Sequence, residues 1–452
     1  MVTAPEIIID GFAGPGGWDV AAARLGLSPV VGIEIDAAAC ATRAAAGHLT
    51  IRADISRYPA EALSGRVLGA IFSPVCTTFS AAGKRAGVAV TSVLDASVRD
   101  AFAGCRTRAA RRREMAAMLR QAWWPSPKLT RAGRSAAIWK AVRSASLVVE
   151  PARFIYASRP EWVAMEQVRE VLPLWKVYAE ELRALGYSAW CGVLNSADYG
   201  VPQTRMRAIL IASRVHEVWC PPPTHYDPRK GDQLFGEPWV SMAEALGWGA
   251  TGRPGPAVTL RRDRGSGRSE EYGEREDTPL DRPAPSITAA TRGSGPRMQW
   301  VLHRDRGAGL KSEGGEHRDR TPDEPAPTIT AGSNGGHGTR LAWKFRNNNN
   351  NNACERSMDE PAGTLFFGGR SNWAAWVQGP GTDSVRISPA EAAILQSFGP
   401  DYPWRGTKTR VFEQIGNAVP PALAEHVLAM AAGVRKTEAA PYGAHAHPGV
   451  TI

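Results

Sequence analysis

The chain has 452 residues, of which 43% are hydrophobic and 22% are charged, and Lys and Arg outnumber Asp and Glu by 54 to 44. This globular composition excludes wholesale disorder, and the length suggests about two or three domains. No apolar run approaches the roughly 18 residues of a membrane span, and the first residues lack the basic flank of a signal peptide, so we expect a cytoplasmic protein.

Six cysteines are scattered along the chain, and they form neither a CxxC pair nor a Cys/His pattern of zinc ligands. They are also too few and too far apart for a disulfide scaffold. We therefore expect reduced cysteines and no metal site.

Short apolar runs alternate with helical patterns from residue 1 to about residue 214, which predicts βαβ units around a parallel sheet. In open α/β sheets, ligands bind beyond the carboxyl ends of the strands. Residues directly after the strands are therefore the candidates for a functional site. The predicted strands are 7–9, 30–33, 67–72, 162–165 and 208–211, and an Ala-rich helix over 20–25 follows the first of them.

A glycine-rich turn, Asp10-Gly-Phe-Ala-Gly-Pro-Gly-Gly-Trp18, follows the first predicted strand. Such a turn lets a nucleotide-like ligand approach the backbone and the start of a helix. It is neither the spaced G-x-G-x-x-G nor a P-loop, so it does not favour a phosphate ligand. Glu34 ends the next strand and could hold a ribose diol, which favours an adenosine-type cofactor. A plain tight turn would explain the glycines as well.

Positive charge is concentrated between residues 99 and 143, where twelve Lys and Arg accompany only two acidic residues. A block of this size suits a polyanion such as nucleic acid. We expect Arg111, Arg112 and Arg113 to contact phosphates there. The alternative is a solvated helix face, and the three tryptophans inside the block either stack on bases or belong to the core.

From Pro221 to about Gly379 the composition shifts to Gly, Pro, Arg, Ser and Thr, and one motif occurs three times. Residues 277–288 recur at 320–330 and, in degraded form, at 357–365. The three copies predict related loop-strand modules in a small β-rich domain.

Glycine-rich loops of these modules carry arginines, notably Arg304 and Arg306. Arginine bidentate to guanine is the commonest specific base contact, so we expect these loops to read a DNA sequence. Alternatively, the arginines pair with Asp263 and Asp305 and only hold the loops.

Helical signals return after residue 386. Ser388 caps a predicted helix over 389–397, and a last helix is predicted over 421–433. We therefore divide the chain into residues 1–214, an inserted domain 215–385, a C-terminal part 386–435 and a disordered tail 436–452.

Four further elements follow the glycine turn in a fixed order: Ser73-Pro-Val-Cys-Thr-Thr-Phe-Ser80, Met165-Glu-Gln-Val168, Gln203-Thr-Arg-Met-Arg207 and Gln414-Ile-Gly-Asn-Ala-Val-Pro-Pro421. Together the five elements resemble the DNA (cytosine-5)-methyltransferase family. The resemblance covers about residues 7–214 and 386–432, and the chain between them lies where that family places its target-recognition domain.

The resemblance implies an α/β, Rossmann-like, doubly wound S-adenosylmethionine-dependent methyltransferase fold with an inserted, smaller β-rich domain. It also implies DNA (cytosine-5-)-methyltransferase activity on duplex DNA, with the target base flipped out of the helix. We expect a monomer that needs no metal, of the kind found in restriction-modification systems. The alternatives are an RNA cytosine-5 methyltransferase and a catalytically inactive, sequence-specific DNA-binding protein.

The catalytic residues implied by the resemblance are Cys76, Glu166, Arg207 and Arg205. Cys76 matches the nucleophile that adds to carbon 6 of cytosine and makes carbon 5 able to attack a methyl group. Glu166 matches the carboxyl that binds ring nitrogen 3 and the exocyclic amine. Arg207 would hold cytosine O2 and a phosphate, and Arg205 ties loops together or contacts phosphate; a surface ion pair is the alternative for both.

For the cofactor, the resemblance implies contacts from the glycine turn, from two carboxylates and from the C-terminal part. Glu34 would bind the ribose hydroxyls and Asp54 the adenine amine. The other implied cofactor residues are Phe12, Ala13, Gly14, Gly16, Gly17, Asn417 and Val419.

Two positions depart from the family pattern. The family usually has Pro-Cys-Gln at the nucleophile and Glu-Asn-Val at the carboxyl, where this chain has Val75-Cys76-Thr77 and Glu166-Gln167-Val168. The nucleophile and the carboxyl are kept, so the departures concern the geometry of the loop and not the class of reaction.

Overall fold

The computed structural model describes residues 6–27, 29–75, 79, 88–105, 107–122, 130–230, 235–247, 343–346, 355–357, 360–362, 375–378 and 384–435. The chain divides into two compact units, one made of residues 1–247, 345–376 and 385–452, the other of 248–344 and 377–384. The first unit contains nearly all of the described residues, including residues 215–247, which the sequence assigns to the inserted domain.

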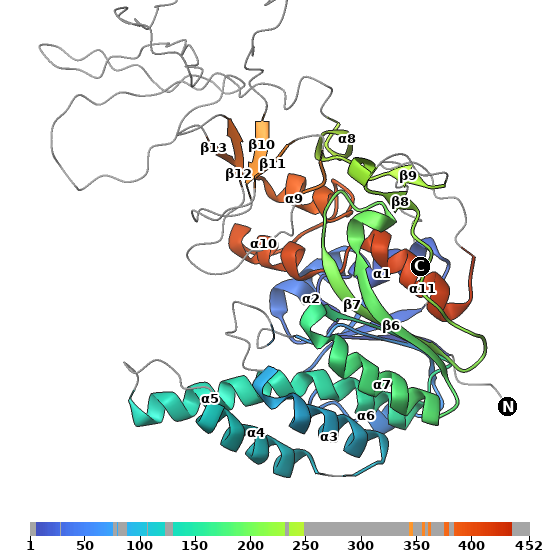
Figure 1. Ribbon diagram of the computed structural model, residues 1–452, viewed down its shortest axis with the longest axis vertical. Helices are drawn as coiled ribbons and strands as arrows, with labels where there is room; N and C mark the ends of the chain where they lie inside the picture. The colour runs from blue at the N-terminus through green and yellow to red at the C-terminus, as the bar shows by residue number, and fades with distance from the viewer. Residues whose placement is uncertain are drawn as a thin grey trace, which may run out of the picture. The chain divides into compact units, whose positions relative to one another are not determined.

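A seven-stranded sheet lies at the centre of the first unit (Figure 1), with the strand order β3-β2-β1-β4-β5-β7-β6. The five strands from β3 to β5 run parallel to one another. All five predicted strands are present, and β3 and β6 were not predicted. The strands are β1 (Ile7–Gly11), β2 (Val30–Glu34), β3 (Leu49–Arg52), β4 (Val67–Phe72), β5 (Trp162–Val168), β6 (Ser188–Asn195) and β7 (Met206–Ser213).

The expectation of a wholly parallel sheet is wrong at one edge. Strand β7 runs antiparallel to both β5 and β6. Helix α7 (Leu172–Ala184) forms the crossover from β5 to β6. The short connection from β6 to β7 contains only the helical turn η6 (Ser196–Tyr199), and it is too short for the crossover that a parallel pair needs.

Alternating side chains of the strands pack on two helical layers. On one face, Ile9 and Phe72 join the core beneath α3 (Thr91–Phe102), α6 (Glu150–Ser158) and α7. On the other face, Ile8 and Ile71 pack against α1 (Gly17–Arg24) and α11 (Pro421–Ala432). The period of two along each strand is what a sheet buried on both faces requires.

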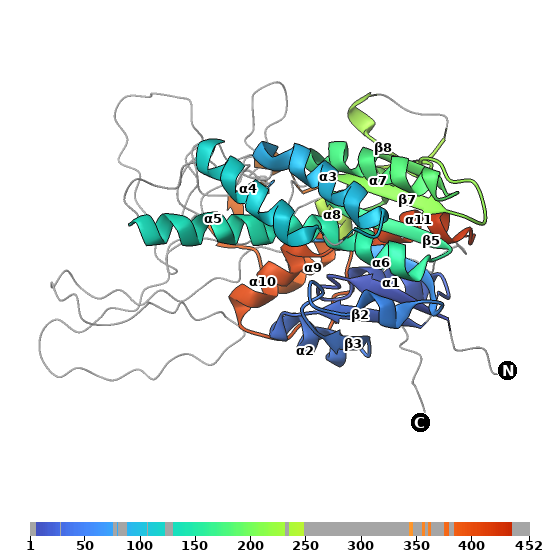
Figure 2. The same ribbon diagram turned by 90° about the horizontal axis from the view of Figure 1, so that it is seen from below.

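The basic stretch forms two helices, α4 (Arg108–Ala122) and α5 (Arg131–Ser146). Figure 2 shows the pair alongside α3, on the same side of the sheet. Met115 and Leu119 on α4, and Ile138 and Val142 on α5, are buried in the core at helical spacing. The apolar stripe of each helix therefore faces the core.

The C-terminal part consists of α9 (Pro389–Leu395), α10 (Lys408–Asn417) and α11, and it completes the layer that contains α1. The predicted cap is confirmed: Ser388 accepts from the backbone N–H of Glu391, whose side chain accepts from the backbone N–H of Ser388. The helix α2 (Ala37–Ala45) packs beside β3.

Short elements make up the remaining described backbone. Strands β8 (His225–Tyr226) and β9 (Glu237–Pro238) pair in parallel and precede α8 (Met242–Ala245). Most of the predicted modules, with Arg304 and Arg306, lie outside the described residues. Within the described part of the chain, no helix is long and apolar enough to cross a membrane. A further sheet has the order β11-β10-β12-β13, from β10 (Trp343–Arg346), β11 (Glu355–Ser357), β12 (Ala375–Gln378) and β13 (Ser384–Arg386).

The first residue of α1 tests how tightly the C-terminal part packs on the rest. A Cβ at Gly17 would lie 2.1 Å from the carbonyl oxygen of Val419, a backbone atom that cannot rotate away. Gly17→Ala should therefore lower the free energy of unfolding by about 1–3 kcal/mol, measured with urea, and expose residues 386–435 to protease.

Gly26→Ala is the matched control, because Gly26 has φ +69° but no atom lies within 4 Å of the methyl group that alanine would add. This substitution adds only backbone strain, which should lower the free energy of unfolding by about 1 kcal/mol. Residues 386–435 should stay protected from protease. Equal protease resistance in both variants would contradict the tight contact.

Candidate active site

The strand order changes direction between β1 and β4, and the two segments of greatest interest leave the sheet there. The glycine turn follows β1, and Ser73 follows β4. The Nε1 of Trp18 donates a hydrogen bond of 2.9 Å to the Oγ of Ser73, which ties the two segments together. Ligands of open α/β sheets bind at such a switch point. Cys76, the predicted nucleophile, comes three residues later and lies outside the described residues.

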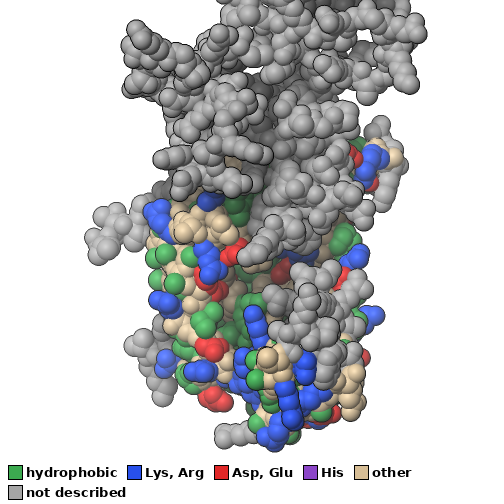
Figure 3. Space-filling model, turned by 90° about the vertical axis from the view of Figure 1, so that its left-hand side faces the viewer, with side chains coloured by type: hydrophobic (Ala, Val, Ile, Leu, Met, Phe, Trp, Pro, Cys, Tyr) green, Lys and Arg blue, Asp and Glu red, His purple; other side chains and the backbone are tan. Residues whose placement is uncertain are grey.

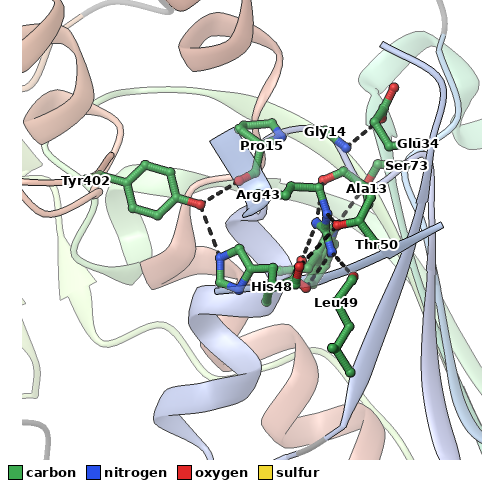
Figure 4. A network of polar contacts seen from close by, with 12 residues as sticks. Ala13, Gly14, Pro15, Glu34, Arg43, His48, Leu49, Thr50, Ser73 and Tyr402 are labelled. Atoms are coloured by element: carbon green, nitrogen blue, oxygen red, sulfur yellow. Dashed lines mark hydrogen bonds and ion pairs between the residues drawn. The ribbon is translucent and has the colours of Figure 1, made fainter. Parts of the chain in front are cut away.

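The glycine turn has the strained backbone that its composition predicts. Gly14 and Gly16 have φ angles of +54° and +107°, and Phe12 has +67°, an unusual value for a residue with a side chain. The N–H of Gly14 donates to Glu34 Oε2 at 2.8 Å (Figure 4). Glu34 Oε1 accepts from the N–H groups of Ile35 and Asp36. The carboxylate at the end of β2 therefore holds the turn in place.

A buried ion pair lies beneath this turn. Arg43 Nη1 and Nη2 donate to the two carboxylate oxygens of Asp19, each at 2.7 Å. Arg43 Nε donates to Thr50 at 2.9 Å, so this guanidinium of α2 joins α1 to β3 (Figure 4). A Cβ at Gly32 would lie 2.1 Å from Arg43 Nη2, so only glycine allows the guanidinium to lie against β2. The sequence motifs gave no signal for Arg43.

Tyr402 reaches the same turn from the C-terminal part. Its hydroxyl donates to the carbonyl oxygen of Pro15 at 2.5 Å and lies 3.2 Å from His48 Nε2 (Figure 4). Burial lowers the pKa of His48, which favours the neutral ring beside the phenol. A Cβ at Gly16 would lie 2.6 Å from His48, so the turn, the histidine and the tyrosine fit only with glycine there.

Glu166 and Arg207 are brought together from adjacent strands. Arg207 Nε lies 2.9 Å from Glu166 Oε1, and the two side chains are 11% and 7% exposed. Burial lowers the pKa of Arg207, and the charge of Glu166 acts against that shift. Met165 is the register partner of Phe72, so Glu166 stands beside the segment that leads to Cys76.

Gln167, the residue that departs from the family pattern, contacts that segment directly. Its Nε2 donates to the carbonyl oxygen of Pro74, and its Oε1 accepts from the N–H of Val168. The position next to Glu166 therefore fixes the chain two residues before Cys76.

Arg205 is buried and faces the C-terminal part. Its Nη1 donates to the carbonyl oxygen of Gly416 at 2.9 Å, and its Nη2 donates to that of Ala418 at 3.3 Å. Gln396 Nε2 donates to the same Ala418 oxygen at 2.7 Å, and Gln396 Oε1 accepts from Gln203. Burial and the charge of Arg207 hold the pKa of Arg205 well below its usual range. Of its two predicted roles, the structure shows Arg205 tying loops together.

The predicted cofactor residues surround one end of the sheet. Asp54 follows β3 and accepts from the N–H of Ser56 at 2.9 Å. Asn417 ends α10, and Val419 contacts Gly17. Glu34 and Asp54 are partly exposed, and no atom lies within 4 Å of a Cβ built on Gly14. Two accessible carboxylates beside an open glycine turn fit the hydroxyl and amine donors of an adenosine ligand.

The three predicted phosphate-binding arginines lie on α4. Arg111 pairs with Asp100 and Glu114, and Arg112 donates to Ser146. Only Arg113 of the three is exposed rather than half-buried.

The strand order and the glycine turn at its switch point define a Rossmann-like α/β methyltransferase fold. The profile of the C-5 cytosine-specific DNA methylase family matches residues 132–235 and 306–431, just over half of the chain. This chain therefore belongs to the C-5 cytosine-specific DNA methylase family.

Two curated relatives align over shorter stretches. The type II methylase M.HgiDII of Herpetosiphon aurantiacus is 33% identical over 84 residues, which are 18% of this chain and 24% of that protein. The type II methyltransferase M1.HphI of Haemophilus parahaemolyticus is 32% identical over 105 residues, 22% of this chain and 28% of that protein. The chain thus aligns with about a quarter of the length of each relative.

Solved structures align over more of the chain at lower identity. One, described as a DNA modification methyltransferase encoded within an E. coli prophage, aligns with 95% of this chain and 99% of its own, at 17% identity and a TM-score of 0.46. The methyltransferase EhMeth of Entamoeba histolytica aligns over 94% and 97%, at 10% identity and a TM-score of 0.40.

Asp10, at the end of β1, gives a test of the charges beneath the turn. It is fully buried, and among the residues that the structure describes neither carboxylate oxygen has a hydrogen-bond partner. Burial and the charge of Asp19 raise its pKa well above its usual range. The folded protein therefore keeps a proton that the unfolded chain releases above about pH 4, and stability falls as pH rises until the raised pKa is passed.

Asp10→Asn replaces this acid with a neutral side chain of the same shape. The variant should unfold at a higher urea concentration than the parent. Its free energy of unfolding should exceed that of the parent by on the order of 1–3 kcal/mol at pH 8 and by less at pH 5. The exposed Asp401→Asn is the control and should change stability equally at both pH values. If the gain in free energy of unfolding from Asp10→Asn does not grow with pH, Asp10 is not protonated in the folded parent protein.

Proposed function

We propose that this protein transfers a methyl group from S-adenosylmethionine to carbon 5 of cytosine in a specific short sequence of duplex DNA. The observation that carries the proposal is the buried Glu166–Arg207 pair beside the segment that leads to Cys76. A carboxylate and a guanidinium with so little exposure to solvent must be compensated by a polar ligand or by each other. Glu166 lies near the carboxyl end of β5 and Arg207 near the amino end of the antiparallel β7, so both face the edge of the sheet where a substrate base would bind.

Cys76 is the proposed nucleophile. Its thiolate forms a bond to carbon 6 of the flipped cytosine, and the electron pair of the ring double bond moves to carbon 5, which then attacks an electrophilic methyl group. Loss of the carbon 5 proton and of the thiolate restores the ring. Glu166 accepts a hydrogen bond from the exocyclic amine and shares a proton with ring nitrogen 3, which stabilises the charge as the thiolate adds. Arg207 fixes Glu166 and binds cytosine O2.

S-Adenosylmethionine supplies the electrophilic methyl group when it is bound. Glu34 would accept from the ribose hydroxyls and Asp54 from the adenine amine. The backbone from Phe12 to Gly17 would border the methionine and adenine side, with Asn417 and Val419 closing the pocket. Arg205 acts on this pocket indirectly, because its hydrogen bonds hold the backbone on both sides of Asn417.

Duplex DNA would contact two further regions. Figure 3 shows Lys and Arg side chains gathered at the lower end of the first unit, where α4 and α5 lie. The exposed members, including Arg113, Arg120 and Lys140, would bind phosphates. The modules between Pro221 and Gly379, with Arg304 and Arg306, would read the sequence.

Replacement of the proposed nucleophile tests the function. Cys76→Ser should abolish transfer of a radiolabelled methyl group to DNA and leave cofactor binding nearly unchanged, because a hydroxyl of much higher pKa does not add to carbon 6. The parent protein should also form a covalent adduct with DNA that contains 5-fluorocytosine. Cys220→Ser, at an exposed cysteine, should keep both activities. Near-normal turnover by Cys76→Ser, or methylation of RNA in preference to DNA, would refute the proposal.

Glu166→Gln tests the electrostatic role separately. The rate constant under saturating cofactor and DNA should fall by about 10²–10³, because an amide cannot share the proton of ring nitrogen 3. Glu237→Gln, at an exposed residue of β9, should retain the parent rate. A parent-like rate in Glu166→Gln would remove this side chain from the mechanism.

A further inference from the structure

A cavity of about 340 Å³ lies between α3, α4, α6 and the helical turn η1 (Ala60–Leu63). None of the proposed catalytic or cofactor residues lines it. Part of its wall is apolar, formed by Ala101, Met115 and Val149. The rest is strongly basic: the guanidinium groups that line it are those of Arg108, Arg111, Arg112 and Arg153.

One buried carboxylate serves three of these guanidinium groups. Glu150 is 4% exposed and forms ion pairs with Arg108 and Arg153, and Arg112 Nη2 approaches it to 4.0 Å. Three guanidinium groups, on side chains that are 26–40% exposed, thus meet one buried carboxylate. The cost of crowding like charges there is offset when an anion enters.

Other nearby acids do not remove this surplus. Arg111 has its own partners, Asp100 at 2.8 Å and Glu114 at 3.0 Å. Glu61 lines the cavity but is exposed, so water screens its charge. Burial and the charge of Arg108 lower the pKa of Arg112, and the charges of Glu150 and Asp54 act against that shift without reversing it.

The N–H groups of Arg108, Arg112 and Arg153 differ in how many of them already donate a hydrogen bond. Arg153 donates to the carbonyl oxygens of Tyr58 and Ile55, and Arg108 donates to that of Ser56. Within the described part of the chain, the only hydrogen bond that Arg112 donates is from Nε to Ser146, at 3.1 Å. The Nη groups of Arg112 are therefore the donors best placed for a ligand.

We propose that this cavity binds a phosphate monoester that carries an apolar or aromatic body. Such a phosphate carries about −1.5 to −2 charges at pH 7, which matches the surplus of the arginines, and its oxygens accept several N–H groups at once. The apolar wall takes the organic part, and the volume is at the lower end of the usual range for ligand pockets, roughly 300–1,000 Å³.

Phenyl phosphate is a suitable probe, because it resembles neither the proposed cofactor nor cytosine. Calorimetric titration of the full chain without cofactor should give saturable binding of one equivalent, and phenol should not bind. This test does not depend on methyl transfer, so it can succeed or fail independently of the proposed function. Absence of saturable binding, or equal binding of phenol, would overturn the proposal.

Two adjacent arginines of α4 supply the matched variants. Arg112→Gln should lower the affinity for phenyl phosphate at least tenfold. Arg112→Lys keeps the charge and should retain most of the affinity. Arg113→Gln is the control, since Arg113 is exposed and does not line the cavity. Thermal unfolding of each variant verifies that it is folded. An equal loss of affinity in Arg113→Gln would show diffuse electrostatic attraction and overturn the proposal.

An internal phosphate of DNA is a diester with one negative charge, so it should not compete with a monoester for this cavity. Repeating the titration with a saturating short duplex tests this expectation. An unchanged affinity for phenyl phosphate supports a site for a free monoester, and a lower affinity, which would show that DNA occupies the cavity, would overturn the proposal.

Discussion

The close contact between the glycine turn and the C-terminal part is the constraint on which the candidate site depends. Val419 presents its carbonyl oxygen where a side chain at residue 17 would otherwise stand. Two residues more than 400 positions apart in the chain thereby form one wall. The hydrogen bonds of Arg205 and of Tyr402 act at either side of this contact. A chain that returns after a long insertion needs such fixed points, because loop closure over that distance costs entropy.

Buried guanidinium groups hold the site, and they are compensated in two ways. Arg43 has a carboxylate of its own in Asp19, and Arg207 has one in Glu166. Within the described part of the chain, Arg205 is hydrogen-bonded to backbone carbonyl oxygens alone, and burial with the charge of Arg207 holds its pKa well below its usual range. A carboxylate that already lies buried beside an arginine in the free protein loses little further water when a substrate base binds next to the pair. This is the preorganisation that makes electrostatic stabilisation effective in a buried site.

The sequence predicted those parts of the structure that depend on neighbours in the chain. The five strands, the turn with positive φ angles and the cap at Ser388 follow from local patterns. Predictions failed where segments distant in the chain meet. The antiparallel direction of β7 shows only in its pairing with β5 and β6. Arg43 gives no signal until α2 packs beside β3 and meets Asp19 of α1. The arginines of α4 illustrate the same limit, since three consecutive residues of one charge have different surroundings. Arg111 and Arg112 face groups from other helices, and Arg113 faces solvent.

The two departures from the family pattern are connected in space. Gln167 stands where the family usually has asparagine, and its amide donates to the carbonyl oxygen of Pro74, directly before Val75-Cys76-Thr77. Glutamine is longer than asparagine by one methylene group, and here its amide reaches the backbone of the segment after β4. A change in the loop that carries the nucleophile therefore accompanies a change in the side chain that supports it. Since Glu166 is the preceding residue on β5, one strand sets the positions of both the stabilising carboxylate and the approach to Cys76.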